Sequence, residues 1–492
     1  MYFSQKIKDD IIDRTMTKFY ITTAIDYVND TIHIGHAFQK IIADVLARYY
    51  RIKLGEKNVF FLTGTDEYGQ KAEKAAKKVG ILTKIFVDKI SKSDQKQQDS
   101  LNISYNRFIR TTDPDHIKVV QEIWNRVNRK GDIYLDKYTG LYCDGCEAYY
   151  TKKDLINGKC PFHPNLKIKK TTEENYFFRW SKYKDFLIHH IKSNPDFILP
   201  KHRANEMLEF VKEIKDIPIS RTNFKWGISV PNNPKQVVYV WFDALINYIT
   251  GIGFLKDKNL FEKFWPADVH ILGKDNLRWH SLLWPAMLKS AEIELPKTIL
   301  VNGFLNLNGE KISKSLGNII KPTDWVKKYG ADAVRYYLLR YTTLTEDSNI
   351  SEEKLIQAYN SDLANGLGNL VSRVTKLCEI NNTDLSTAQT IKTQIIDSSI
   401  LVKYEHYIEN YTLNLALEEI WKDIKVLNTK INQEKVWSLS KENADQYIKY
   451  YVKQIKNIAI AIRPFLPKTS KSIIGQFSGQ YIKLKSSLFP RI

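Results

Sequence analysis

Residues 19–50 read FYITTAIDYVNDTIHIGHAFQKIIADVLARYY, and their pattern predicts a buried strand followed by a helix. The apolar run at 19–25 is typical of a buried strand. From Phe38 onward, apolar residues recur at helical spacing, which predicts a helix. His33 and His36 therefore lie where a strand hands over to a helix N-terminus, and backbone N–H groups and the helix dipole attract phosphate there.

A second string, KISKS at residues 311–315, lies on a Gly-flanked loop and offers two lysines and two hydroxyls. Lys311 and Lys314 are mobile cations that suit the far side of a polyphosphate. Either string alone is also compatible with a solvated turn or loop. Because both occur in one chain in this order, they predict an ATP clamp.

The composition is that of a globular protein with a polyanionic partner. The chain has 492 residues, more than one hydrophobic core supports, and 43% of them are hydrophobic. Its formal net charge of +19 favours a nucleic-acid partner. The lysines are spread along the whole chain, however, and an AT-rich genome also produces such a composition. Charge therefore agrees with nucleic-acid binding without establishing it.

The sequence also bears on the location and the oligomeric state of the protein. No stretch approaches eighteen apolar residues, so we expect no membrane span. Residues 1–16 contain three aspartates, and no apolar region of the kind found in secretion signals follows them, which predicts a short N-terminal extension rather than a targeting peptide. The cysteines form no disulfide framework, so we expect a reducing, cytoplasmic location. The chain ends soon after its last helical segment without an appended oligonucleotide-binding domain, and we expect a monomer.

Three cysteines and a histidine have the spacing of a metal site. Cys143-x-x-Cys146 and Cys160-x-x-His163 can close a tetrahedral site around one structural Zn²⁺ per chain, because four side-chain ligands leave no open position. Gly145 permits the tight turn after the first cysteine. A redox role for the first pair is the alternative, although no thioredoxin-like pattern surrounds it.

The order of the elements predicts an α/β fold with appended helices. Strands alternate with amphipathic helices from residue 17, short turn-rich pieces interrupt them, and strand-like runs return at 237–241, 268–272 and 298–301. We expect a Rossmann-type doubly wound parallel sheet, split by a zinc-bearing insertion domain and followed by an α-helical bundle. The expected parts are the extension at 1–16, the first half of the sheet domain at 17–130, the inserted domain at 131–225 with its knuckle at 143–163, the second half at 226–305, the KISKS loop and linking subdomain at 306–360, and the helical domain at 361–492.

Polar residues near strand ends are candidates for binding a ligand. Asp66 follows a strand at 59–63, where ligands bind in open α/β sheets, and it can pair with an ammonium group or else cap the next helix. Gly273 and Asp275 follow another strand and offer a close-approach glycine and a carboxylate for ribose hydroxyls. Trp241 and Tyr248 can wall an apolar pocket, or they can simply pack in the core.

The two strings at 33–36 and 311–315 resemble the signatures of class I aminoacyl-tRNA synthetases, with Ile312 where Met is commoner. FLTGTDEYG at 61–69 is similar to a string of methionyl-tRNA synthetases, in which His more often holds position 68. The resemblance covers about residues 17–465. It implies that the protein activates L-methionine with ATP, accompanied by Mg²⁺, to methionyl-adenylate. It also implies transfer of the methionyl group to the 3′ end of tRNA(Met), including the initiator.

The resemblance also implies residue roles. His33, His36, Lys311 and Lys314 would be catalytic, and ATP would be bound by His33, Gly35, His36, Gly273, Asp275 and Lys314. Methionine would be bound by Ala24, Ile25, Tyr27, Asp66, Trp241, Ala244, Leu245, Tyr248 and His280, with Asp66 holding its amino group. Asn276 departs from the pattern, because an apolar residue is usual there. Either its amide turns to solvent or ribose, or the pocket is more polar than usual.

The helical segment carries a second candidate site. Asn369 and Arg373 are spaced i and i+4, on one helix face, where an amide and a guanidinium can hydrogen-bond exposed bases, and Trp437 can stack on one. A solvated helix face and a core tryptophan are the alternatives. The resemblance implies that these three residues read the CAU anticodon, although Val436 replaces the usual Pro.

Two other functions compete with this interpretation. A cysteinyl-tRNA synthetase also carries zinc, but its metal grips the substrate thiol and needs an open coordination position, which the closed knuckle does not provide. A non-catalytic tRNA-binding paralogue would have no use for an ATP clamp, yet both strings and Asp66 are intact.

Overall fold

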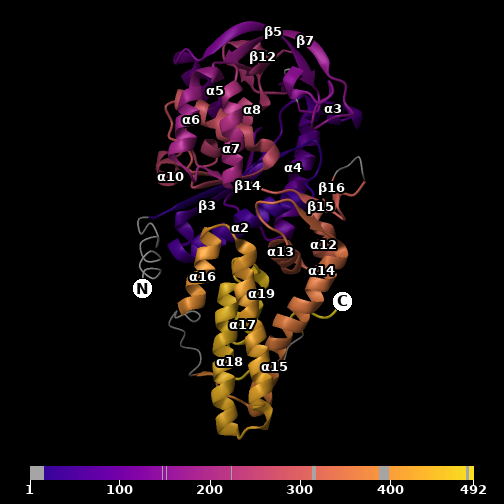
Figure 1. The fold of residues 1–492 in the computed structure, drawn as a ribbon, viewed down its shortest axis with the longest axis vertical. Helices are drawn as coiled ribbons and strands as arrows, with labels where there is room; N and C mark the ends of the chain where they lie inside the picture. Colours follow the sequence, from indigo (N-terminus) through magenta and orange to yellow (C-terminus); the bar gives the residue numbers. More distant parts are fainter. Residues whose placement is uncertain are drawn as a thin grey trace.

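The protein is described by a computed structural model over residues 16–146, 148–150, 152–222, 224–312, 317–386, 398–483 and 487–492. Of the expected extension at 1–16, all but Met16 lies outside these residues, as does Lys314 of the KISKS string. In Figure 1, a sheet domain occupies one part of an elongated molecule and a helical bundle extends from it. No helix in the described part is both long enough and apolar enough to cross a membrane.

The centre of the sheet domain is a seven-stranded sheet with the order β2-β3-β1-β13-β14-β8, in which β4 also pairs with β3. Every ladder in it is parallel, which confirms the expected parallel α/β architecture. The strands predicted at 19–25, 59–63, 268–272 and 298–301 all belong to it. Its strands are β1 (Phe19–Thr23), β2 (Asp26–Tyr27), β3 (Val59–Asp66), β4 (Arg107–Arg110), β8 (Ile198–Leu199), β13 (Val269–Gly273) and β14 (Thr298–Asn302).

The two halves of the chain meet between β1 and β13, which pair directly although partners such as Thr22 and His270 are 248 residues apart in the chain. From β1 the chain continues to β3 on one side, and from β13 it continues to β14 on the other. This reversal of strand order is where open α/β sheets bind ligands, beyond the carboxyl ends of the strands. The helices of this domain are α2 (Ile34–Leu54), α3 (Gln70–Lys78), α4 (Thr83–Ser100), α5 (Pro114–Arg129), α9 (Asn247–Thr250), α10 (Lys258–Phe264) and α11 (Trp284–Ser290).

The segment 131–225, expected to be one inserted domain, contributes strands to three sheets. Its four-stranded antiparallel sheet has the order β6-β5-β7-β9 and lies at the end of the molecule away from the bundle (Figure 1). Between β7 and β9, however, the chain returns to the central sheet, where β8 pairs with β14 between two helices. The elements are β5 (Ile133–Cys143), β6 (Ala148–Tyr150), β7 (Lys169–Phe178), α6 (Lys184–Ser193), α7 (Lys201–Phe210) and β9 (Ile217–Pro218).

The strand-like run at 237–241 ends earlier than its apolar pattern suggests. Strand β12 stops at Val238, Tyr239 caps the next helix in an extended conformation, and Trp241 is already helical. Because β12 pairs antiparallel with two short strands, it lies in a separate sheet rather than in the parallel one. The elements here are β10 (Ser220–Arg221), β11 (Ser229–Val230), β12 (Asn233–Val238) and α8 (Val240–Ala244).

The remaining chain is a small linking sheet followed by helices. β15 pairs with β16 and β17, so Lys311, the first residue of the KISKS string, lies at an exposed strand end. The elements are β15 (Leu305–Leu307), β16 (Glu310–Lys311), β17 (Ser348–Ile350), α12 (Pro322–Tyr329), α13 (Ala331–Arg340), α14 (Glu352–Ala358), the π-helical η8 (Tyr359–Gly368), α15 (Asn369–Asn381), α16 (Ser398–Glu409), α17 (Leu413–Glu434), η10 (Val436–Ser438), α18 (Lys441–Ala461) and α19 (Pro467–Gln476).

A fully buried ion pair joins the sheet domain to the bundle. Arg335 Nη1 of α13 lies 2.7 Å from Asp44 Oδ2 of α2, and both side chains are completely inaccessible to solvent. Arg335 also donates to the backbone oxygens of Phe465, Pro464 and Leu101. Burial opposes ionisation of Asp44, but Arg335 and its other partners hold the pKa of this carboxyl below its ordinary value. The bundle is therefore anchored on α2.

We predict that Arg335→Met lowers the free energy of unfolding by about 3–5 kcal/mol, because it leaves a buried carboxylate without its principal partner. Chemical denaturation followed by circular dichroism measures this. Arg340→Met is the matched control on α13, since Arg340 is partly exposed and its ion pair with Glu418 spans 3.5 Å. Equal, small losses for both variants would contradict the anchoring role of Arg335.

Candidate active site

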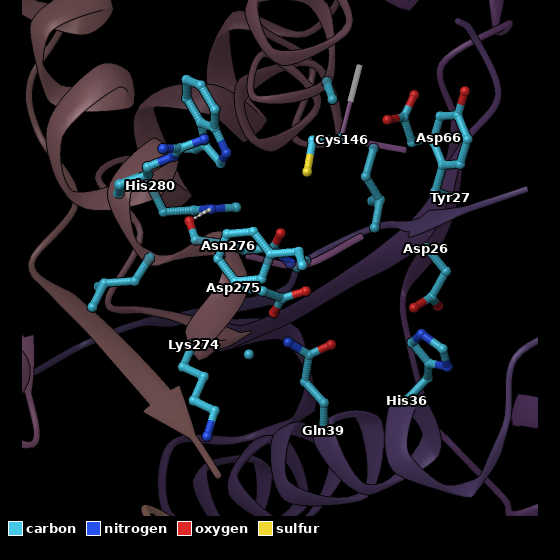
Figure 2. A pocket seen from close by; sticks show the side chains of 18 of the residues that line it. Asp26, Tyr27, His36, Gln39, Asp66, Cys146, Lys274, Asp275, Asn276 and His280 are labelled. Atoms are coloured by element: carbon cyan, nitrogen blue, oxygen red, sulfur yellow. Dashed lines mark hydrogen bonds between the residues drawn. The ribbon is translucent and has the colours of Figure 1, made fainter. Parts of the chain in front are cut away.

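A cavity of about 640 Å³ lies beyond the carboxyl ends of β1, β3 and β13. Figure 2 shows side chains from both halves of the sheet domain converging on it. All of the residues expected to contact methionine line it, as do those expected to contact ATP in the described part of the chain. These are Ala24, Ile25, Tyr27, Asp66, Trp241, Ala244, Leu245, Tyr248 and His280, together with His33, Gly35, His36, Gly273, Asp275 and Lys311.

The two histidines at the start of α2 are joined by backbone hydrogen bonds. His33 is the N-cap: its Nδ1 accepts from the Gly35 N–H (3.1 Å), and its own N–H donates to His36 Nδ1 (3.3 Å). Both rings, when neutral, therefore carry their proton on Nε2. A Cβ at Gly35 would lie 2.9 Å from His33 Cε1, so a glycine suits this turn.

Burial favours the uncharged form of these two rings. Burial lowers the pKa of His33 to about 3, and the adjacent His36 adds to this. The His36 side chain is open to the cavity. Desolvation by the surrounding protein is nevertheless the main cause that lowers its pKa to about 3, and the charge of Lys40 adds to this. The two rings, 3.9 Å apart, thus offer neutral Nε2–H donors toward the cavity, as a phosphate oxygen requires.

The expected methionine side of the cavity has one polar pair in an aromatic wall. His280 Nδ1 lies 2.9 Å from the Asn276 carbonyl, which can only accept, so Nδ1 carries the proton. Burial lowers the pKa of His280 to about 4, which leaves Nε2 as the acceptor for the Tyr248 hydroxyl at 2.7 Å. Trp241 stacks on Trp279 with ring centroids 5.0 Å apart. The backbone carbonyl of Asn276 thus holds the His280 ring, and the Asn276 side chain borders the cavity.

Asp66 is the last residue of β3 and is nearly buried, with 8% of its surface exposed. It does not cap the next helix, because the N-cap of α3 is Gly69 and no side chain caps that helix. The alternative role raised by the sequence is therefore wrong. Beside it, Glu67 turns away from the cavity and pairs with Arg110 at 2.6 Å. Asp66 is left as the carboxylate at this strand end that faces the cavity (Figure 2).

On the opposite wall, Asp275 follows β13 and borders the cavity with Lys274 and Lys311. Burial raises the pKa of Asp275, while the nearby Lys311 and backbone N–H groups oppose this rise. Lys274 is held by Asp347 at 2.7 Å and lies 4.5 Å from the centre of the Phe304 ring. Lys311 lies over the same ring at 5.9 Å, so the described cation of the KISKS string already points along this wall.

The predicted metal ligands come together. The sulfur atoms of Cys143, Cys146 and Cys160 and the Nδ1 atom of His163 all lie within 4.8 Å of one another. Cys146 Sγ is 3.4 Å from Cys160 Sγ and 3.2 Å from His163 Nδ1. A tetrahedral site with ordinary Zn–S and Zn–N bonds has ligand separations of about 3.5–3.8 Å. A Cβ at Gly145 would lie 2.4 Å from the His163 ring, so this glycine makes room for the ligand. The cluster fits a metal ion.

The expected anticodon residues also meet, at the far end of the bundle from the cavity. Arg373 Nη2 donates to Asn432 Oδ1 (2.6 Å), and its guanidinium lies 6.0 Å from the centre of the Trp437 ring. Asn369 Nδ2 donates to Asn428 Oδ1 (3.2 Å). Trp437 is 56% exposed, so it is not a core residue. The two asparagines of α17 were not predicted, because single polar residues on an amphipathic helix carry no functional signal.

The sequence also missed Asp26, Gln39 and Lys40, which lie at the base of the cavity or beneath it. A signal for them did exist. Gln39 and Lys40 interrupt an apolar helical pattern, and Asp26 directly follows an apolar strand. Polar residues in such positions need partners inside the protein, but a pattern of residues cannot say which ones.

Comparison with known proteins identifies the class. A family model described as "tRNA synthetases class I (M)" matches residues 19–167 and 164–375, which is more than half of the chain. The methionine–tRNA ligase of Clostridium perfringens is 43% identical over 94% of this chain and 73% of its own length. That of Mycobacterium tuberculosis is 40% identical over 93% of this chain and 92% of its own length. The chain belongs to the methionine–tRNA ligase family of class I tRNA synthetases.

Solved structures agree with this assignment. The M. tuberculosis methionyl-tRNA synthetase in complex with methionyl-adenylate has a TM-score of 0.88 and 36% identity, and the match covers 96% of this chain and all of that one. The apo form of the same enzyme matches with a TM-score of 0.81.

Proposed function

We propose that this protein is a methionine–tRNA ligase that converts L-methionine and ATP to methionyl-adenylate and pyrophosphate, then transfers the methionyl group to the 3′ end of tRNA(Met), initiator tRNA included. The observation that carries the proposal is the cavity at the β1/β13 junction. It holds an aromatic wall, a strand-end carboxylate and two neutral imidazole donors together.

The first step needs no protein nucleophile. The methionine carboxylate attacks the α-phosphorus in line, and pyrophosphate leaves, so catalysis rests on positioning and on stabilising the transferred charge. His33 and His36 donate from Nε2 to phosphate oxygens, and Lys311 closes over the pyrophosphate as it leaves. Lys314, outside the described residues, is proposed to close over it as well. Mg²⁺ would accompany ATP and neutralise part of its charge.

Methionine is proposed to lie between Asp66 and the Tyr248–His280 pair. The Asp66 carboxylate pairs with its ammonium group, and Ala24, Ile25 and Tyr27 contact it from the loop after β1. Trp241, Ala244 and Leu245 enclose the side chain, whose thioether packs well against ring edges. Because Nε2 of His280 accepts from the Tyr248 hydroxyl and its Nδ1 donates to the Asn276 carbonyl, both ring nitrogens are already hydrogen-bonded where they face the side chain. Gly273 and Asp275 would hold the ribose of ATP.

We predict that ATP–pyrophosphate exchange by the purified protein depends on methionine and is at least about tenfold slower with cysteine, leucine or isoleucine. Norleucine should be rejected only modestly, since exchanging S for CH₂ in an apolar pocket is worth ~1–3 kcal/mol. Isotopic exchange measured with each amino acid tests this. A better rate with cysteine would favour the cysteinyl-tRNA synthetase alternative, and no exchange at all would favour a non-catalytic tRNA-binding paralogue.

The metal is proposed to be one structural Zn²⁺, held by Cys143, Cys146, Cys160 and His163. Three thiolates and an imidazole are a donor set typical of zinc. Four protein ligands leave no position for a substrate thiol, which argues against cysteine as the substrate. Cys146 and His163 also border the cavity, so the metal would stabilise part of its wall.

We predict about one zinc per chain by atomic emission analysis of the purified protein. Cys160→Ala should lose most of the metal and lower the melting temperature, because metal binding contributes to folding in such clusters. Cys378→Ala is the matched control, since Cys378 is buried in the bundle outside the cluster. Unchanged zinc content in Cys160→Ala would remove this residue from the ligand set.

The bundle is proposed to read the CAU anticodon of tRNA(Met). Arg373 and Asn369 offer hydrogen-bond donors on one face of α15, and the exposed Trp437 can stack on a base. The net charge of +19 supports a nucleic-acid partner. A monomer and a cytoplasmic location stay predictions from the sequence.

The domain boundaries are proposed as predicted, with one change. The inserted domain comprises β5 to β7 with the metal cluster, together with residues 212–225, whose strand β9 pairs with β7. Residues 184–211 are assigned to the central sheet because β8 pairs there. The other parts keep their limits at 17–130, 226–305, 306–360 and 361–492.

We predict that Arg373→Ala weakens aminoacylation by ~1–3 kcal/mol in kcat/KM while ATP–pyrophosphate exchange stays near the wild-type rate. The loss should be greatest for tRNA with a CAU anticodon. The matched control is Lys376→Ala, which removes an exposed cation of the same helix that pairs with Glu379. Equal losses for CAU and non-CAU transcripts in Arg373→Ala would show that this residue contacts only the RNA backbone.

A further inference from the structure

Lys40 is a completely buried lysine directly beneath the cavity. It lies on the second turn of α2, and its Nζ donates to Asp26 Oδ1 (2.7 Å), to Gln39 Oε1 (3.0 Å) and to the backbone oxygen of Ala24 (3.2 Å). An ammonium group has three N–H donors, so all of them are used. Burying a lysine is costly unless it is paired and fully hydrogen-bonded, and this site meets both conditions.

The partners of Lys40 belong to the loop that follows β1. Ala24 is held through both backbone groups, because its oxygen accepts from Lys40 and its N–H donates to the Ile271 oxygen of β13 at 2.9 Å. The same Ile271 oxygen accepts from Gln39 Nε2 at 2.8 Å. At the other end of the loop, Tyr27 is in register with Asp66 of β3. Segment 24–27 is therefore tied to α2, β13 and β3 at once.

Within this loop, Asp26 lies next to the part of the cavity that is proposed to bind ATP. It borders the cavity and lies above the His36 ring in Figure 2, with 6% of its surface exposed. One of its oxygens is paired with Lys40, and the other, Oδ2, has no hydrogen-bond partner among the described residues. The ion pair thus connects the loop that contacts methionine with the turn that carries the histidines.

We propose that Lys40 and Asp26 form a positioning pair for adenylate formation. The pair fixes Ala24, Ile25 and Tyr27 relative to His33 and His36, so that the methionine carboxylate and the α-phosphorus meet in near-attack geometry. Neither residue transfers a proton or makes a bond to the reacting atoms. The inference rests on the proposed function and names the residues that align its two substrates.

The effect of such a pair is on turnover rather than on affinity. Displacing the loop by a fraction of an ångström leaves the substrate contacts largely in place but misaligns the reacting atoms, and misplacement of about 1 Å can cost about 100-fold in rate. If Lys40 only stabilised the fold, its replacement would instead reduce the number of active molecules. These two roles are separable when rates are expressed per active site.

The test is a double-mutant cycle with Lys40→Met, Asp26→Asn and the double variant, which keep the size of both side chains. Active sites are counted from the burst of methionyl-adenylate, and kcat and KM come from ATP–pyrophosphate exchange. We expect Lys40→Met to lower kcat per site about 10–100-fold, with both KM values changed less than about threefold. The double variant should recover about fivefold or more of that loss, because it leaves no unpaired buried charge.

Lys53→Met is the matched control on the same helix. Lys53 pairs with Glu409 at 2.5 Å near the other end of α2 and is 27% exposed, so its loss should leave kcat per site unchanged. If Lys40→Met yields too little folded protein, Asp26→Asn alone carries the test, with the same expected split between kcat and KM.

Three results would overturn the inference while the wild-type protein remains active with methionine. These are a kcat per site close to wild type in Lys40→Met and Asp26→Asn, a loss confined to the number of active sites, and a double variant no better than the single ones. Absence of methionine-dependent exchange in the wild-type protein would contradict the proposed function instead.

Discussion

The structure depends on the complete burial of helix α2. Every residue from 37 to 47 is buried, so this helix has no solvent-facing side over three turns. Any charge within it must be neutralised inside the protein. Two such charges exist, and each is used to join parts of the molecule. Lys40 holds the loop after β1, and Asp44 holds Arg335 of the linking helices.

This arrangement explains how one helix serves two domains. Its N-terminus presents His33 and His36 to the cavity, its second turn fixes the loop that borders the same cavity, and its third turn anchors the bundle through Arg335. A single hydrophobic cluster runs from β1 through α2 into the bundle. The cavity and the proposed anticodon surface are thus parts of one packed body, although they lie far apart (Figure 1).

The protonation states of the cavity histidines depend on burial more than on neighbouring charges. The imidazoles of His33, His36 and His280 all have lowered pKa values, and each has one nitrogen whose partner is a backbone group. Their tautomers are therefore set by the main chain. The sites proposed for phosphate and for the methionine side chain differ because His33 and His36 use Nδ1 as an acceptor, whereas His280 uses it as a donor.

The sequence by itself determined the local chemistry. The strands at 19–25, 59–63, 268–272 and 298–301, the helix that begins after His33, and the metal-ligand spacing at 143–163 all depend on near neighbours or short periodicities, and the structure contains each of them. Tertiary structure alone decided which elements lie side by side. β8 returns from the insertion to pair with β14, β12 lies in a separate sheet, and Trp241 reaches the cavity from a helix. It also decided that Lys40 pairs with Asp26 and Asp44 with Arg335, because a buried charge takes whichever partner the packing brings within reach, and residues far apart in the chain leave no periodic trace of that choice.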